Sequence, residues 1–177
     1  SPTRELGIQI ADDLRLFSKN ILNLNVVNVY GGASIDDQIR KLRRGAHVIV
    51  ATPGRLLDMI RRKAVDLSKI EYLILDEADE MLDMGFLEEI KEIFEYIPQN
   101  RQTLLFSATM PAPIKELASN ILYQPEYISV VGDEETTNNI IDQRYYMIHE
   151  NQRDDAIVKL LETEKTNKCI IFCRMKR

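Results

Sequence analysis

The sequence predicts an α/β fold, with a parallel β-sheet that carries helices on both of its faces. Short apolar runs alternate with longer amphipathic stretches along residues 1–131. Strict alternation of strand and helix is typical of βαβ units, which build parallel sheets with right-handed crossovers. The short runs are apolar throughout, as strands need to be when helices cover both sides of them.

Strands and helices can be placed along this stretch from its hydrophobic periodicity. Apolar runs predict strands at residues 26–29, 48–51, 72–75, 104–106 and 127–131. Apolar residues at helical spacing predict helices that include residues 6–17, 35–42, 56–60, 87–97 and 114–121. Each predicted strand is therefore separated from the next by a helix.

A polar segment divides the chain into two regions. Residues 132–139 are polar, charged and without periodicity, which is typical of a linker. After them we expect a strand at 143–148, a helix that carries Ile157, Leu160 and Leu161, and a strand at 169–172. Residues 140–177 are too few for an independent α/β domain, so we expect the beginning of a second domain there.

Charge restricts the class of protein. The net charge is −5, which argues against a highly basic protein that coats nucleic acid. The basic residues nevertheless form three clusters, and each is either a binding surface or a solvated helix face or end. These clusters are Arg40, Lys41, Arg43 and Arg44; Arg61, Arg62 and Lys63; and Arg174, Lys176 and Arg177.

Hydropathy and cysteine usage indicate a cytoplasmic protein without membrane contact. No apolar run approaches the length of a membrane span, and the first residues show no signal-peptide pattern. The two cysteines, Cys169 and Cys173, lie in an apolar run and are predicted to be buried, reduced thiols. His47 and His149 are isolated, so no zinc site of Cys and His is predicted.

Two adjacent carboxylates follow the predicted strand at 72–75. They begin the segment Asp76-Glu77-Ala78-Asp79. Ligands of parallel sheets bind beyond the carboxyl ends of the strands, where unpaired charge need not be buried. Mg²⁺ binds one or two carboxylates together with substrate phosphates, so Asp76 suits a magnesium ligand and Glu77 can polarise an attacking water. The alternative is an acidic helix N-terminus, which the helix dipole also favours.

Two hydroxyl residues are expected at the same edge of the sheet. Ser107-Ala108-Thr109 directly follows the predicted strand at 104–106. The hydroxyls of Ser107 and Thr109 can hydrogen-bond to the acidic residues. Alternatively they cap the next helix, whose start nearby is indicated by Pro111.

The segment Thr52-Pro53-Gly54-Arg55, after the predicted strand at 48–51, is typical of a phosphate-binding helix N-terminus. Thr52 suits an N-cap and Pro53 the first helical residue. Gly54 leaves the backbone accessible, and Arg55 adds a positive charge. Capping alone is the alternative role of these residues.

Two further segments at strand or helix ends repeat this chemistry. Thr3 and Arg4 combine a hydroxyl and a cation at a helix start, and Gly31-Gly32 follows the strand at 26–29. Capping and turn formation are again the alternatives. Together the three segments could form a track of backbone donors that binds phosphates without an overall basic protein.

In this order, the segments resemble those of DEAD-box RNA helicases, within the second helicase superfamily. The resemblance rests on Pro2-Thr3-Arg4-Glu5-Leu6, Gly31-Gly32, Thr52-Pro53-Gly54-Arg55, Asp76-Glu77-Ala78-Asp79 and Ser107-Ala108-Thr109. The longer stretches 76–86 and 106–111 are also similar to the family, and residues 170–174 resemble the opening of its second domain. The style of the sequence is most similar to bacterial members. The resemblance implies an N-terminally incomplete RecA-like helicase ATP-binding domain at 1–131. It also implies the beginning of a RecA-like helicase C-terminal domain at 140–177.

The resemblance further implies ATP and Mg²⁺ as cofactors and RNA as a partner. Asp76 would hold Mg²⁺, Glu77 would activate the hydrolytic water, and Asp79 with Ser107 and Thr109 would couple the state of ATP to RNA binding. The RNA backbone, which carries no base sequence, would be contacted by Thr3, Arg4, Gly32, Thr52, Gly54 and Arg55. Contacts to the 2′-hydroxyl would favour RNA over DNA. The implied activity is ATP-dependent unwinding or remodelling of short RNA duplexes.

One expected motif does not occur in these residues. No phosphate loop of the form G-x-x-x-x-G-K-[ST] is present, and in the family this loop precedes the Pro-Thr-Arg-Glu-Leu segment. Phosphoryl transfer depends on that loop and on cations of the second domain, so the 177 residues alone are predicted to be inactive. Two alternatives remain: a non-catalytic RNA-binding or partner-docking module with the same fold, and a DNA translocase of the same superfamily.

Overall fold

The chain forms two compact units in the computed structural model, Ser1–Glu126 and Tyr127–Arg177. The structure describes residues 1–130, 142, 144–164 and 168–172. The linker predicted at 132–139 lies outside the described residues, so the linker and the domain boundaries built on it stay predictions.

Helices and strands alternate along the first unit, as the hydrophobic pattern predicts. Their order is α1 (Arg4–Phe17), β1 (Val26–Val29), α2 (Ile35–Arg43), β2 (Val48–Ala51), α3 (Pro53–Arg61), β3 (Tyr72–Leu75), α4 (Ala78–Asp83), α5 (Leu87–Phe94), β4 (Gln102–Leu105) and α6 (Ala112–Ile121).

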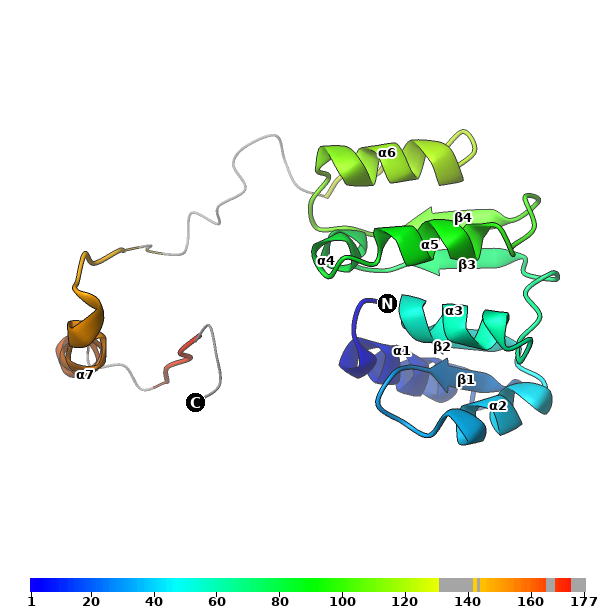
Figure 1. The fold of residues 1–177 in the computed structure, drawn as a ribbon, viewed down its shortest axis with the longest axis horizontal. Helices are drawn as coiled ribbons and strands as arrows, with labels where there is room; N and C mark the ends of the chain where they lie inside the picture. Colours follow the sequence, from blue (N-terminus) through cyan, green and yellow to red (C-terminus); the bar gives the residue numbers. More distant parts are fainter. Residues whose placement is uncertain (131–141, 143, 165–167, 173–177) are drawn as a thin grey trace. The chain divides into compact units, whose positions relative to one another are not determined.

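The first sheet consists of β1 and β2, which pair in parallel. On one face α1 packs through Ala11 against Val26. On the other face α2 and α3 pack through Leu42 and Met59 against Val27. Figure 1 shows these two strands between the helices. A parallel sheet between two helical layers is therefore confirmed in this half of the unit.

The second sheet consists of β3 and β4, also parallel, with Leu75 beside Leu105. Helices α4, α5 and α6 cover the face that carries Leu75, and Ile114 of α6 is fully buried there. Tyr72 and Ile74 alternate to the other face, where they are 64% and 57% exposed. The structure thus covers this sheet on one face, whereas the first sheet is covered on both.

The single sheet predicted from the sequence is present as two pairs of strands, β1 with β2 and β3 with β4. Packing of α3 against α5 joins the two halves. The buried side chains of this junction are Leu57, Ile60, Leu67, Ile93 and Ile97. The strand arrows of both sheets point the same way in Figure 1, so the carboxyl ends of the strands lie on one edge of the unit.

Several details of residues 1–130 differ from the prediction. Strand β4 begins at Gln102 and ends at Leu105, whereas a strand was predicted at 104–106. Helix α4 was not predicted, because six residues are too short for helical periodicity to show. Helix α5 ends at Phe94 rather than at residue 97. The strand predicted at 127–131 is wrong for its described residues, where no β-ladder forms and Val130 is 98% exposed. Backbone groups of a strand need a neighbouring strand to bond with, and β propensity alone does not supply one.

The second unit contains the predicted helix but not the predicted strands. A 3₁₀ turn, η1 (Glu150–Gln152), leads into α7 (Arg153–Glu164). No strand is assigned at the described positions of 143–148 and 169–172, where Tyr145 and Phe172 are exposed. These short apolar runs have no sheet neighbour or core to pack on among the described residues, and isolated strands are not stable.

One cysteine departs from the prediction of buried thiols. Cys169 is exposed, because the strand that would have placed it in a core does not form. Cys173 lies outside the described residues. Among the helices that the structure describes, none is both long and apolar enough to cross a bilayer.

Candidate functional site

The acidic segment lies in a turn between β3 and α4. Asp76 is half-buried, and Glu77 is exposed with a left-handed backbone, φ 53° and ψ 56°. This conformation is unfavourable for a residue with a Cβ and persists only where neighbours enforce it. Here the N–H of Ala78 donates to the carbonyl of Phe106 at 3.0 Å, which fixes the turn against the end of β4.

Asp79 joins this turn to the Ser107-Ala108-Thr109 segment. The N–H and the hydroxyl of Thr109 both donate to Asp79 Oδ2 at 2.8 Å. Ser107 Oγ accepts from the N–H of Asp79 at 3.1 Å and donates to the carbonyl of Thr109 at 2.7 Å. Of the two roles predicted for these hydroxyls, bonding to the acidic segment is the one observed.

The pKa of Asp79 reflects this network. Partial desolvation alone would raise the pKa of the carboxyl, but the hydrogen-bonding network, led by the two bonds that Thr109 donates, outweighs it. The net result is a pKa below the ordinary value of an aspartate, so Asp79 is a stable anion at neutral pH. A network of this kind holds the two strand ends in one arrangement.

Asp76 and Glu77 differ from Asp79 because no described group hydrogen-bonds to their carboxylates. They also precede α4, so the alternative of an acidic helix N-terminus is compatible with the structure. No group of three or more His, Cys, Asp or Glu that could hold a metal is found among the described residues. One or two open carboxylates are the donor set for Mg²⁺ that also binds phosphates, and Asp76 fits that ion.

The glycine pair after β1 forms a loop at residues 30–33 that two arginines contact. Gly32 has φ +77°, a conformation that strains other residues. The guanidinium of Arg4 lies 5.2 Å from the centre of the Tyr30 ring. Arg55 Nη1 donates to the carbonyl of Ala33 at 3.2 Å. Three separate predicted segments, on α1, α3 and this loop, are therefore brought together.

The remaining predicted residues of this edge lie at helix starts. Thr3 Oγ1 accepts from the N–H of Leu6 at 3.2 Å and caps α1. Thr52 occupies the N-cap position of α3 without a side-chain capping bond, and Pro53 is the first helical residue as predicted. Gly54 is exposed, with nothing within 4 Å of the position a Cβ would take. The backbone there is open to a ligand.

The segment before α1 lies against the end of β2. The backbone nitrogen of Ser1 donates to the carbonyl of Ala51, the last residue of β2, at 3.0 Å.

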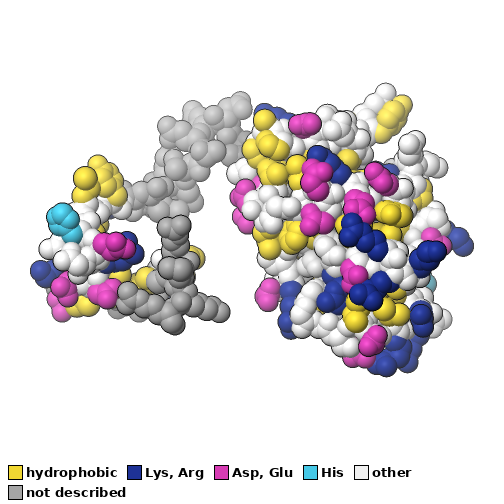
Figure 2. Space-filling model, viewed as in Figure 1, with side chains coloured by type: hydrophobic (Ala, Val, Ile, Leu, Met, Phe, Trp, Pro, Cys, Tyr) yellow, Lys and Arg dark blue, Asp and Glu magenta, His cyan; other side chains and the backbone are white. Residues whose placement is uncertain are grey.

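Three arginines of the first two basic clusters form ion pairs with acidic residues on helix surfaces. Arg40 pairs with Asp37, Arg62 with Asp58 at 2.8 Å, and Arg61 with Glu92 at 2.7 Å. Figure 2 shows acidic and basic side chains interspersed on this face of the first unit. Exposed pairs of this kind contribute little stability. They favour the interpretation of these arginines as solvated helix surface, and the cluster at 174–177 lies outside the described residues.

Two residues of this edge were missed by the sequence analysis. Tyr30 carries the ring under Arg4, and Gln38 of α2 is a buried polar residue, 4% exposed. The signal available for Gln38 was a polar residue between the apolar positions Ile35 and Leu42, on the buried side of a helix.

The parallel α/β fold, with an acidic and a hydroxyl segment linked at its strand ends, is that of a helicase-type domain. The family model described as DEAD/DEAH box helicase matches residues 1–117, and the chain belongs to this family. The chain is 48% identical over its full length to the DEAD-box ATP-dependent RNA helicase CshA of Streptococcus pneumoniae. It is 45% identical, also over its full length, to the DEAD-box ATP-dependent RNA helicase RhpA of Helicobacter pylori. It spans 33% and 36% of the lengths of these relatives.

Solved structures give the same result for the fold. A DEAD box protein from Methanococcus jannaschii superposes with a TM-score of 0.69 and 40% identity, over 92% of this chain and 43% of that one. The RecA-like α/β fold inferred from the motifs is therefore confirmed.

Proposed function

We propose that the natural gene product containing these residues is an ATP-dependent RNA helicase. The observation that carries the proposal is the hydrogen-bonded junction between the acidic segment and the hydroxyl segment, through Asp79, Ser107 and Thr109. Because this junction holds the acidic turn and the end of β4 together, a displacement of the turn would also move the end of β4. Coupling between ATP binding and RNA binding requires such a connection. The names of the relatives, all RNA helicases, support the same activity.

In this proposal Asp76 binds Mg²⁺ and Glu77 orients and polarises the attacking water. The ion would neutralise charge on the phosphates, which is its usual contribution to phosphoryl transfer. Asp76 and Glu77 are suited to these roles because described residues leave their carboxylates open at the carboxyl end of β3, where ligands of parallel sheets bind.

RNA would bind along the ends of β1 and β2 and the starts of α1 and α3. The proposed contacts are to the sugar-phosphate backbone, so binding is independent of base sequence. Helix starts offer N–H groups, and arginines add charge-assisted bonds to phosphate. The residues are Thr3, Arg4, Gly32, Thr52, Gly54 and Arg55.

Catalysis requires more than the groups present in these residues. The 177 residues contain no phosphate loop, and phosphoryl transfer depends on such a loop and on cations from a second domain. We therefore propose that residues 1–131 belong to an ATP-binding domain and 140–177 to a second helicase domain. By themselves these 177 residues would not hydrolyse ATP.

The variant Glu77→Gln tests the proposal in the natural gene product. We expect ATP turnover to fall by about a hundredfold to ten-thousandfold, the range for losing a general base, while ATP and RNA still bind. Glu80→Gln is the matched control, because Glu80 is an exposed carboxylate on α4. Unchanged turnover in Glu77→Gln would refute the role given to Glu77.

The alternative function is that of a non-catalytic binding module with the same fold. A protein that keeps the fold without the loop would bind RNA or a protein partner and would not hydrolyse ATP. The gene sequence upstream of Ser1 distinguishes the two. A Gly-Lys-Thr loop about 20–30 residues upstream supports the enzyme, and a reading frame without one supports the binding module.

A further inference from the structure

We infer that Gln38 is a positioning residue for RNA binding, because it holds the loop at residues 30–33 in its binding conformation. This inference rests on the proposed function, in which Gly32, Arg4 and Arg55 contact the RNA backbone. Gln38 itself is buried, at 4% exposed, and its amide is already bound to the backbone of Tyr30. Its role would therefore be exerted through the loop.

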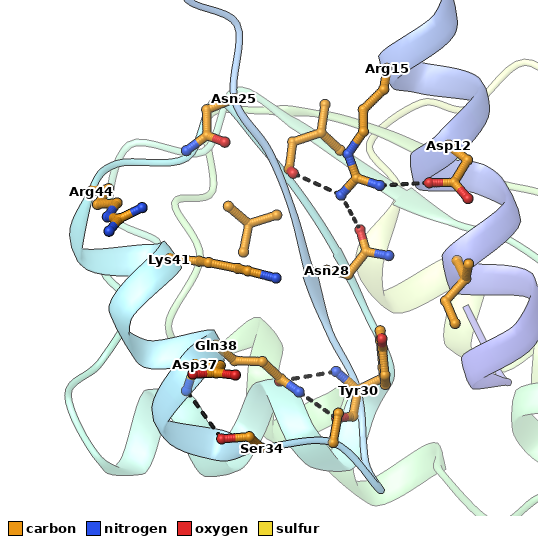
Figure 3. A pocket seen from close by; sticks show the side chains of 14 residues that line it. Asp12, Arg15, Asn25, Asn28, Tyr30, Ser34, Asp37, Gln38, Lys41 and Arg44 are labelled. Carbon is orange, nitrogen blue, oxygen red and sulfur yellow. Dashed lines mark hydrogen bonds and ion pairs between the residues drawn. The ribbon is translucent and has the colours of Figure 1, made fainter.

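The side chain of Gln38 bonds to both backbone groups of one residue. Gln38 Nε2 donates to the carbonyl of Tyr30 at 2.9 Å, and the N–H of Tyr30 donates to Gln38 Oε1 at 3.2 Å. Figure 3 shows this side chain reaching from α2 to the end of β1. β1 pairs with β2 along one of its edges. The amide of Gln38 satisfies the N–H and the carbonyl of Tyr30, directly after β1, as the backbone of a paired strand would.

Tyr30 is the residue at which the strand turns into the glycine loop. Its backbone is fixed by Gln38, and its ring lies under the guanidinium of Arg4. Two residues further on, Gly32 takes up φ +77°, and Arg4 Nη1 lies 3.5 Å from the position of its missing Cβ. A shift of Tyr30 would therefore move both Gly32 and Arg4.

The loop is also held from its far end. Arg55 Nη1 donates to the carbonyl of Ala33, so α1, α2 and α3 each contribute one side chain to residues 30–33. Of these three side chains, Arg4 and Arg55 are charged and belong to the proposed RNA contacts. Gln38 is the neutral, buried member, which gives it a geometric role only.

Glutamine is chemically specific at this position. Its amide offers one donor and one acceptor on the same group, as the carbonyl and N–H of Tyr30 require. Glutamate keeps the acceptor but places a second oxygen against the Tyr30 carbonyl. Methionine keeps the length of the side chain and offers no strong donor or acceptor, which leaves both backbone groups unpaired.

The test compares Gln38→Met and Gln38→Glu with the unaltered natural gene product. Binding to a single-stranded RNA and ATP hydrolysis as a function of RNA concentration are measured at fixed salt. In Gln38→Met we expect the Kd for RNA, and the RNA concentration for half-maximal stimulation, to rise about tenfold, as for the loss of one or two hydrogen bonds. The rate at saturating RNA and the KM for ATP should stay unchanged.

Gln102→Met is the matched control, because Gln102 is an exposed glutamine at the opposite, amino end of β4. It should bind RNA like the unaltered protein. Thermal unfolding shows whether each variant is folded, and Gln38→Glu supplies the comparison if Gln38→Met is not. Folded variants of Gln38 with unaltered RNA affinity would overturn the inference and leave the proposed function in place.

A double variant separates positioning from a general loss of stability. Gln38→Met and Gly32→Ala both disturb the loop, so their combined effect on the Kd for RNA should be smaller than the product of the single effects. Fully multiplicative effects would overturn the inference. If the unaltered gene product binds no RNA, the proposed function fails, and the inference fails with it.

Discussion

The loop at 30–33 and the acidic turn of Asp76 and Glu77 lie at the same edge of the first unit but are held differently. Side chains from α1, α2 and α3 all contact the loop. The acidic turn is fixed through its backbone and through Asp79, and described residues leave the Asp76 and Glu77 carboxylates open. The loop is preorganised by the chain itself, whereas the turn presents groups that need a ligand.

This difference corresponds to the two ligands proposed. An RNA backbone is a repeating chain of phosphates that a rigid row of donors can bind without reading bases. Two neighbouring carboxylates repel each other and are stabilised by a cation with bound phosphates. We therefore expect substitutions at the turn to abolish chemistry, and substitutions at the loop to weaken RNA binding.

The largest effect is expected for Asp76→Asn. Loss of the carboxylate would weaken Mg²⁺ binding with ATP, and we expect ATP hydrolysis in the natural gene product to fall by at least about a hundredfold. A titration with MgCl₂ at fixed ATP measures it, with Asp83→Asn at the exposed end of α4 as the control. Hydrolysis at the normal rate and with the normal dependence on Mg²⁺ concentration would contradict the proposal that Asp76 binds Mg²⁺.

A smaller effect is expected for Arg55→Gln, on RNA alone. Loss of one phosphate contact should raise the Kd for RNA about tenfold and reduce the salt dependence of log K by about 0.7, the value for one charge on a single strand. Arg62→Gln is the control, since Arg62 lies at the other end of α3 and pairs with Asp58. A change in ATP affinity instead of RNA affinity would contradict the separation of the two regions.

The smallest effect is expected for Asp79→Asn, on stability and its pH dependence. Burial alone would raise the pKa of Asp79, but the hydrogen-bonding network, led by the two bonds from Thr109, brings the pKa below the ordinary value. A lowered folded-state pKa stabilises the protein above the unfolded-state pKa, and this contribution is lost as pH falls through the folded-state value.

Urea denaturation of Asp79→Asn measures this contribution. At pH 7 we expect a loss of about 1 kcal/mol in the free energy of unfolding, since the neutral amide accepts weaker hydrogen bonds. Below about pH 4 the difference from the unaltered protein should shrink, because Asp79 becomes protonated. A difference that is constant from pH 7 to pH 3 would show that the Asp79 network does not depend on its charge.

The sequence was sufficient to predict most of the first unit. Strands such as 26–29 and 72–75 are apolar runs between amphipathic helices, and their parallel pairing with other strands follows from that pattern. The predicted strands at 127–131, 143–148 and 169–172 are also apolar, but no strand forms at their described residues. Whether an apolar run becomes a strand depends on a neighbouring strand, which local sequence does not encode.

The candidate site was predictable only in part. The residue types of Asp76, Glu77 and Arg55, and their positions after strands, indicated chemistry at one edge of a sheet. The sequence left open whether the hydroxyls of Ser107 and Thr109 bond to the acidic segment or cap the next helix, because residues 30 apart meet only through the pairing of β3 and β4. Gln38 was missed for a related reason. It binds the backbone carbonyl and N–H of Tyr30, and because nearly every residue type carries these groups, the sequence does not indicate which ones Gln38 binds.

The most direct test of the account is nucleic-acid stimulation of ATP hydrolysis by the natural gene product. Hydrolysis is measured with single-stranded RNA and with single-stranded DNA of the same base sequence. We predict strong stimulation by RNA and little by DNA, because contacts to the 2′-hydroxyl favour RNA. Equal stimulation by both would indicate a DNA translocase, and the absence of ATP hydrolysis with either would contradict the central claim.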